Sequence, residues 1–211
     1  MLTVVTHTRN DRPELLKRSA ASVELALGPE IKHRIIECTD DWGKARLDAT
    51  QLDEYVAFVD DDDTVEPGAL ELCLSVAKQT QAGIVVTDET LVDIEGKVIR
   101  RLPSFKSYSG LCVHPRSAHH LCLIRRDAVD PRALDLHRRY GNLGADWAIK
   151  TSAALSKGGI YVPIFGYNWT QHADTMNTRE KNSFSRIMYQ LGMEMRQLWK
   201  PQPGELPRWK L

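Results

Sequence analysis

The sequence predicts a single α/β domain with a mostly parallel central sheet flanked by helices. Its 211 residues suit one compact domain and leave little room for a second. Short β-branched or apolar runs alternate with helix-like segments through the first half of the chain, and this alternation is typical of parallel pairing. Four consecutive acids follow one of these runs, at the strand end where open α/β sheets bind ligands.

Three strands and two helices are predicted before the acids. Leu2–His7 is a β-branched run that predicts the first strand. Asp11, Arg12 and Pro13 then open a helix through about residue 26, because the proline ring is preset for a first helical turn. The elements that follow are a strand at 31–38, a short helix at 43–52 and a strand at 55–59.

A third helix and a hairpin are predicted directly after the acids. The helix starts at Glu66-Pro67-Gly68 and ends near 81–83. A strand at 84–88 follows it, and Gly96 marks the turn of the hairpin. The apolar residues that recur at helical spacing in this helix are Leu70, Cys73, Leu74 and Ala77.

The second half of the chain is less regular. Apolar residues from Phe184 to Leu198 recur at helical spacing, so the domain is expected to close with an amphipathic helix. We therefore expect a domain over 1–200 and an extended or mobile tail over 201–211, which contains further prolines and a glycine. The other predictions are a loop at 103–115, a strand at 120–124, a turn at 140–144, a helix at 146–156 and a strand at 160–162.

Composition argues against several classes of protein. The chain has 28 basic and 28 acidic residues, so no net field favours nucleic acid or a membrane surface. Its four cysteines lie far apart, which argues against a zinc site and a disulfide framework, and we expect them to be reduced. The chain shows neither a signal sequence nor a transmembrane segment, which predicts a soluble cytoplasmic protein.

The four acids, Asp60 to Asp63, are the plainest chemical signal. They follow the apolar run Tyr55–Val59 and repel one another, so a divalent cation is the expected guest. In an extended segment Asp60 and Asp62 would face one ion while Asp61 points away. Mg²⁺ or Mn²⁺ bound there would keep positions open for phosphate oxygens, which indicates nucleotide or nucleotide-sugar chemistry.

Other interpretations fit the same residues. Asp60, Asp62 and Thr64 after an apolar strand also match the haloacid-dehalogenase phosphatase signature, in which the first aspartate, here Asp60, is a nucleophile. A calcium loop ending at Glu71 is disfavoured because Val65 stands where such a loop needs glycine. The simplest alternative is an acidic, solvated turn.

Several segments together resemble the family 2 glycosyltransferases of the GT-A fold, over nearly the whole chain and in the right order. They are residues 3–18, 43–46, 58–63 and 66–70. By this resemblance a set of residues would line the nucleotide sugar: Thr6, Thr8, Asn10, Asp11, Arg12, Asp40, Arg46, Asp60 and Asp61. Asn10 and Asp11 are also ordinary helix-capping residues, and Arg46 fits a solvated helix face.

Later segments resemble the rest of that family. Gly144-Ala145-Asp146-Trp147 resembles the Glu-Asp motif, which would make Asp146 the general base, with Ala145 in place of the usual glutamate. Asp146 would otherwise be a helix cap. Residues 159–163 and 167–172 match the final strand and its histidine, so Asp60, Asp62 and His172 would hold Mn²⁺ or Mg²⁺. A loop at 177–180 would close over the diphosphate.

The resemblance implies a metal-dependent, inverting hexosyl- or pentosyltransferase. Its partners would be a nucleotide-diphosphate sugar donor and a hydroxyl-bearing acceptor of open class, whether saccharide, protein or a hydroxylated nucleic-acid base. The arginine pairs 125–126 and 138–139 would suit the last of these. Two other functions stay open, namely a phosphatase that uses Asp60 and a non-catalytic nucleotide-sugar binding module, which Ala145 and the short second half suggest.

Overall fold

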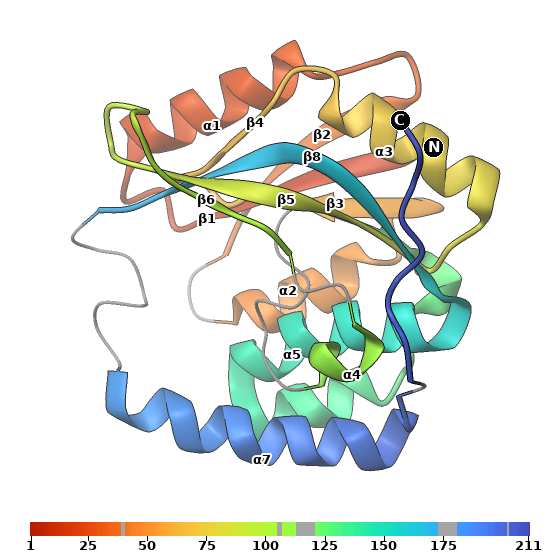
Figure 1. The fold of residues 1–211 in the computed structure, drawn as a ribbon. Coiled ribbons are helices and arrows are strands. Elements are labelled where there is room, and N and C mark those ends of the chain that lie inside the picture. The colour runs from red at the N-terminus through yellow and green to blue at the C-terminus, as the bar shows by residue number, and fades with distance from the viewer. Residues whose placement is uncertain (39–40, 105–106, 113–120, 173–180, 202) are drawn as a thin grey trace.

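A computed structural model shows a curled central sheet with helices on both of its faces (Figure 1). The structure describes residues 1–38, 41–104, 107–112, 121–172, 181–201 and 203–211. Within them the sheet has eight strands in the order β2-β1-β3-β7-β5-β8-β4, and β6 pairs with the later residues of β5, Glu89–Val92. The strands are β1 (Leu2–Thr8), β2 (Ile31–Glu37), β3 (Tyr55–Phe58), β4 (Thr64–Val65), β5 (Ile84–Val92), β6 (Val98–Leu102), β7 (Cys122–Arg125) and β8 (Gly159–Thr170).

The predicted α/β fold is confirmed, and its sheet is mixed. Parallel pairing joins β1 to β2 and to β3, as the alternation of strands and helices predicts, and it also joins β5 to β8. Antiparallel pairing joins β7 to β3 and β5, β6 to β5, and β4 to β8. The predicted hairpin turns at Gly96, whose φ of 85° suits a residue without a side chain. A turn this tight requires β6 to run antiparallel to β5.

Helices form a layer on each side of the sheet (Figure 1). On one side lie α1 (Pro13–Leu25) and α3 (Ala69–Thr80), and on the other lie α2 (Trp42–Ala49) and α5 (Ala133–Lys157). The last helix, α7 (Lys181–Trp199), packs on the outer side of α5 and buries Met188, Leu191 and Met195. It confirms the amphipathic helix expected there.

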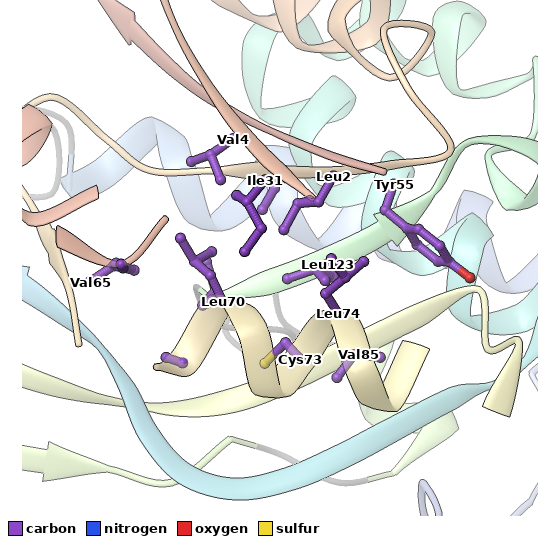
Figure 2. Close-up of a cluster of buried hydrophobic side chains, with 14 of the residues drawn as sticks. Leu2, Val4, Ile31, Tyr55, Val65, Leu70, Cys73, Leu74, Val85 and Leu123 are labelled. Atoms are coloured by element: carbon purple, nitrogen blue, oxygen red, sulfur yellow. The ribbon is translucent and has the colours of Figure 1, made fainter. Parts of the chain in front are cut away.

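Alternate residues of the central strands fill the two cores. Tyr55 and Ala57 of β3 point to the layer of α1 and α3, while Val56 and Phe58 point to α2 and α5. This two-residue period is that of a strand buried on both faces. Figure 2 shows the first core, in which Leu70 and the rest of one face of α3 pack against the strands.

Some elements differ from the sequence prediction. The expected loop at 103–115 contains a short helix, α4 (Tyr108–Leu111), and β8 extends well beyond the predicted strand at 160–162. The turn expected at 140–144 is a kink within a longer helix, because Gly141 has a φ of 67° while the residues on both sides are helical. The two-residue strand β4 is too short to have a sequence pattern of its own.

The last residues lie along β8. The backbone N–H of Tyr161 donates to the carbonyl of Pro207 at 2.9 Å, and the N–H of Trp209 donates to the carbonyl of Tyr161 at 2.7 Å. Leu206 is buried in the core between the sheet and α5. This segment, dark blue in Figure 1, therefore crosses the sheet edge as an extended strip.

Two further observations concern the cysteines and the helices. Cys38, Cys73, Cys112 and Cys122 are all free thiols. Burial raises the pKa of Cys73 to about 12, so this thiol stays protonated and unreactive. In the described parts of the chain, none of the helices combines the length and the apolar character that crossing a membrane requires.

Truncation of Leu70 should destabilise the fold strongly. Leu70 is completely buried, whereas Leu25 on α1 is 80% exposed. Leu70→Ala should lower the free energy of unfolding by about 2–5 kcal/mol, and Leu25→Ala by about 0.5 kcal/mol or less. Urea denaturation of both variants tests this, and equal losses would contradict the assignment of the core.

Candidate active site

The four acids form a turn at the carboxyl end of β3. The backbone N–H of Asp63 donates to the carbonyl of Asp60 at 3.1 Å, and Asp61 and Asp62 are the turn residues between them. The predicted position at a strand end is therefore confirmed. The expected alternation is wrong, because a turn does not send successive side chains to opposite faces as a strand does.

Asp61 and Asp62 share one arginine instead of pointing apart. The Arg12 guanidinium donates through Nη2 to Asp61 and through Nη1 to Asp62, each at 2.6 Å. Thr8 Oγ1 also donates to Asp61 at 2.7 Å. Burial raises the pKa of Asp61, while the Thr8 hydroxyl and the Arg12 charge act in the opposite direction. The loop after β1 is thus tied to the acid turn.

His172 joins the same group from the far end of β8. Its Nε2 lies 2.9 Å from Asp62 Oδ2 and 3.2 Å from Arg12 Nη1. The side chain is only 8% exposed. The structure therefore brings together the first loop, the acid turn and the end of the final strand, as the family resemblance implies.

Asp60 belongs to a second group, centred on Arg46 of α2. The Arg46 guanidinium donates to Asp60 through Nη2 and to Asp146 through Nη1. It also lies against the Trp42 and Phe58 rings, 4.8 and 5.1 Å from their centroids. Burial alone would lower the pKa of Arg46, but Asp60 and Asp146 outweigh it and raise the pKa above its ordinary value. Arg46 is therefore buried and structural, which excludes a solvated helix face.

Close packing of α2 on α5 places Arg46 beside Asp146. The backbone N–H of Gly43 donates to Asn142 Oδ1 at 2.8 Å. A β-carbon on Gly43 would lie 2.8 Å from the Asn142 backbone, so only glycine permits this approach. Asp146 lies inside α5 and does not cap it, and its Oδ2 accepts from Lys150 at 3.1 Å.

Lys150 is a site residue that the sequence prediction missed. Its side chain is only 4% exposed, and it stands one helical turn after Asp146. A buried lysine needs a partner, and the i, i+4 spacing from Asp146 was the available signal. Arg46 and Lys150 thus both donate to the Asp146 carboxylate, one to each of its oxygens.

Neighbouring elements fix the backbone of the acid turn. Arg18 donates to the carbonyl of Asp62 at 2.9 Å and to Thr170 Oγ1 at 2.8 Å. Asp63 is buried and accepts from the Tyr167 hydroxyl at 2.8 Å and from the Thr170 N–H at 2.7 Å. Burial, with the nearby Asp62 and Asp60 charges, raises the pKa of Asp63 well above its ordinary value. Asp63 thus anchors the acid turn to β8.

Some of the remaining predicted site residues lie near the acid turn, and others do not. The N–H of Asn10 donates to Thr8 Oγ1 at 2.9 Å, and Asp11 is exposed with Oδ1 3.6 Å from Arg12 Nε. Neither caps α1, because no side chain bonds to that helix start. Thr6 lies outside the cluster, with its hydroxyl 3.0 Å from Nε2 of His33 on β2. Asp40 and the loop at 177–180 lie outside the described residues.

The predicted metal ligands have suitable chemistry but do not converge. Carboxylates and imidazole suit Mn²⁺. Asp60 faces Arg46, however, while Asp62 and His172 face Arg12. Within the described ranges, no group of three or more His, Cys, Asp or Glu side chains is arranged to hold a metal ion. This arrangement does not fit a divalent cation, and metal dependence stays a prediction.

Comparison with known proteins identifies the fold. No protein-family model matches the sequence, and no curated protein matches it. Solved structures of S. aureus TarS do match, over 92% of this chain. The chain has the GT-A fold.

The likeness to TarS is one of fold and not of sequence. TarS 1–349 in complex with UDP-GlcNAc aligns with a TM-score of 0.63 at 12% identity, and a structure of TarS itself aligns with a TM-score of 0.61 at 13% identity. This GT-A chain spans 66% of the first of these chains and 39% of the second.

Removal of the Arg46 side chain should destabilise the protein. Arg46→Ala would leave Asp60 and Asp146 without the guanidinium that joins them. We expect a loss of about 3 kcal/mol in the free energy of unfolding, because an uncompensated buried charge is costly. The exposed Arg34 on β2 is the control, and Arg34→Ala should change stability by about 0.5 kcal/mol at most. Equal urea midpoints would contradict this role.

His7 should make the protein sensitive to acid. Burial, reinforced by the Arg46 charge, lowers the pKa of His7 from 6.5 to about 4. As the pH falls from 6.5 to 4 the unfolded chain takes up a proton that folded His7 does not, so stability is lost across this window. His7→Phe should lose about 1–3 kcal/mol less than the wild type between neutral pH and pH 4. Parallel pH curves of unfolding free energy would disprove this.

Proposed function

We propose that this chain is a family 2 glycosyltransferase that moves a sugar from a nucleotide diphosphate to an acceptor hydroxyl. The observation that carries the proposal is that Arg46 joins Asp60, at the carboxyl end of β3, to Asp146 on α5. It links the strand end where such sheets bind nucleotides to a carboxylate able to act as a base. The GT-A fold supports the same conclusion.

The donor we propose is a uridine-diphosphate sugar. Support comes from the fold shared with TarS, whose structure was solved in complex with UDP-GlcNAc. Thr8, Arg12 and Asp60 lie around the end of β1 and β3, where the diphosphate and ribose would lie. The sugar is open, and both hexosyl and pentosyl transfer remain predictions.

The proposed reaction is a single displacement that inverts the anomeric centre. The acceptor oxygen forms a bond to the anomeric carbon as the bond from that carbon to the diphosphate oxygen breaks, and the hydroxyl proton passes to Asp146. Arg46 and Lys150 orient the Asp146 carboxylate by its two oxygens. The departing diphosphate needs a cation beside it. The predicted Mn²⁺ or Mg²⁺ would supply that charge, although the arrangement of Asp60, Asp62 and His172 does not favour it.

The two alternative functions differ from this proposal in separate ways. A phosphatase would need Asp60 as a nucleophile, and this carboxylate is instead paired with Arg46 in a GT-A fold. A binding module would bind the donor without turnover, so an activity measurement separates it from the enzyme.

The acceptor is open in class. Of the two arginine pairs considered for nucleic acid, Arg125 pairs with Asp127 at 2.8 Å, Arg138 with Asp135 at 3.3 Å, and Arg139 with Glu194. Acids beside these arginines reduce the local positive field. A saccharide or protein hydroxyl is therefore the better first choice in acceptor screens.

Asp146→Asn should abolish transfer while leaving the donor bound. The amide cannot take the acceptor proton, so kcat should fall about 10²–10⁴-fold with an unchanged Kd for UDP. The donor is first chosen by thermal-shift screening of nucleotide sugars, and transfer or donor hydrolysis is then measured. Asp135→Asn is the control, because Asp135 is exposed on the same helix. Full activity in Asp146→Asn would rule out this residue as the base.

A further inference from the structure

We propose that the Arg12 guanidinium is the cation that stabilises the departing diphosphate, in the role expected of a metal ion. This inference rests on the proposed glycosyl transfer and changes how it is carried out. Arg12 binds Asp61 and Asp62 at 2.6 Å each and lies 3.2 Å from His172. It therefore lies among Asp61, Asp62 and His172, where the sequence predicts a divalent cation.

The acid turn is held in the shape that suits Arg12. Ser19 donates to the carbonyl of Asp60, Arg18 to that of Asp62, and Thr170 to the Asp63 carboxylate. These bonds come from α1 and from the end of β8, so the turn is fixed on two sides. Because the turn directs Asp60 toward Arg46, the Asp60 and Asp62 carboxylates reach different cations.

Three cations already lie among the four carboxylates Asp60, Asp61, Asp62 and Asp146. Arg46 and Lys150 neutralise Asp60 and Asp146, and Arg12 lies between Asp61 and Asp62. A divalent cation placed among these carboxylates would be repelled by Arg12 unless that side chain moved away. Planar guanidinium groups match carboxylate and phosphate oxygens in the same forked geometry, so Arg12 can hold the acids and contact a diphosphate.

Part of the Arg12 side chain is also exposed to solvent, where a ligand can contact it. Its side chain is 29% exposed, while Asp61 and Asp62 behind it are 6% and 14% exposed. It is the N-cap residue of α1, where the helix dipole adds positive potential. An incoming diphosphate would thus meet Arg12 before it met the acids.

The first experiment compares wild-type turnover with and without a metal chelator. UDP binding and hydrolysis of the best donor from thermal-shift screening are measured in EDTA and then in Mn²⁺. We expect equal rates in both, because Arg12 provides the charge. Loss of turnover in EDTA with recovery in Mn²⁺ would overturn the proposal.

The second experiment measures Mn²⁺ binding by electron paramagnetic resonance, without donor. The wild type should leave the signal of free Mn²⁺ unchanged. Loss of Arg12 frees the Asp61, Asp62 and His172 side chains to rearrange, so Arg12→Ala should bind Mn²⁺, whereas Arg34→Ala should behave as the wild type. Arg12→Gln, which keeps more of the side-chain volume, serves if the alanine variant does not fold. Equal Mn²⁺ binding by the wild type and the Arg12 variants would also overturn the proposal.

The third measurement is turnover of the same variants. In EDTA, Arg12→Ala should lower kcat about 10²–10³-fold, and Mn²⁺ should restore part of it. Arg12→Lys keeps the charge without the fork and should retain more activity than Arg12→Ala. Normal turnover of Arg12→Ala in EDTA would exclude this role. If no nucleotide sugar binds or reacts under any condition, the proposed function fails, while the Mn²⁺ measurement still decides which cation the acids hold.

Discussion

Neutralisation of the crowded carboxylates is the constraint on which the rest of the site depends. Four acids in one turn, with Asp146 beside them, would repel one another, most strongly where the side chains are largely buried, as at Asp61 and Asp146. Cations from the N-cap of α1, from α2 and from α5 pair with them there, and the buried Asp63 is held by hydrogen bonds from β8. The sheet and its two helix layers therefore hold these cations next to the acid turn.

The position of the site could be predicted from the sequence because it depends on local patterns. The run Tyr55–Val59 is uniformly apolar and the acids follow it directly, so adjacent residues predict both the strand and its charged end. Pro13, Gly96 and the period of α7 likewise fix a helix start, a turn and an amphipathic face. In each of these cases one short segment contains the whole signal.

The pairing of charges could not be predicted, because it depends on how distant segments meet. Whether Asp61 points away or toward Arg12 depends on a turn whose shape is set by Arg18 and Thr170. Strand order also depends on how distant segments meet. β7 comes later in the chain than β3 and β5 but lies between them, and its antiparallel pairing makes the sheet mixed. The kink at Gly141 could not be predicted either. A glycine among residues typical of a turn can end a helix or only bend it, and here it bends α5.

A guanidinium and a metal ion would impose different demands on the fold. A metal ion needs several donors that converge on one point, whereas a guanidinium needs acceptors spread along the edge of a plane. The acid turn meets the second demand, with Asp61 and Asp62 along one edge of Arg12 and Asp60 turned to Arg46. A single positive charge is also weaker than a divalent one, which makes the nearby Arg46 and Lys150 more important to the field at the site. The number and direction of arginines around an acidic motif therefore matter as much as the motif itself.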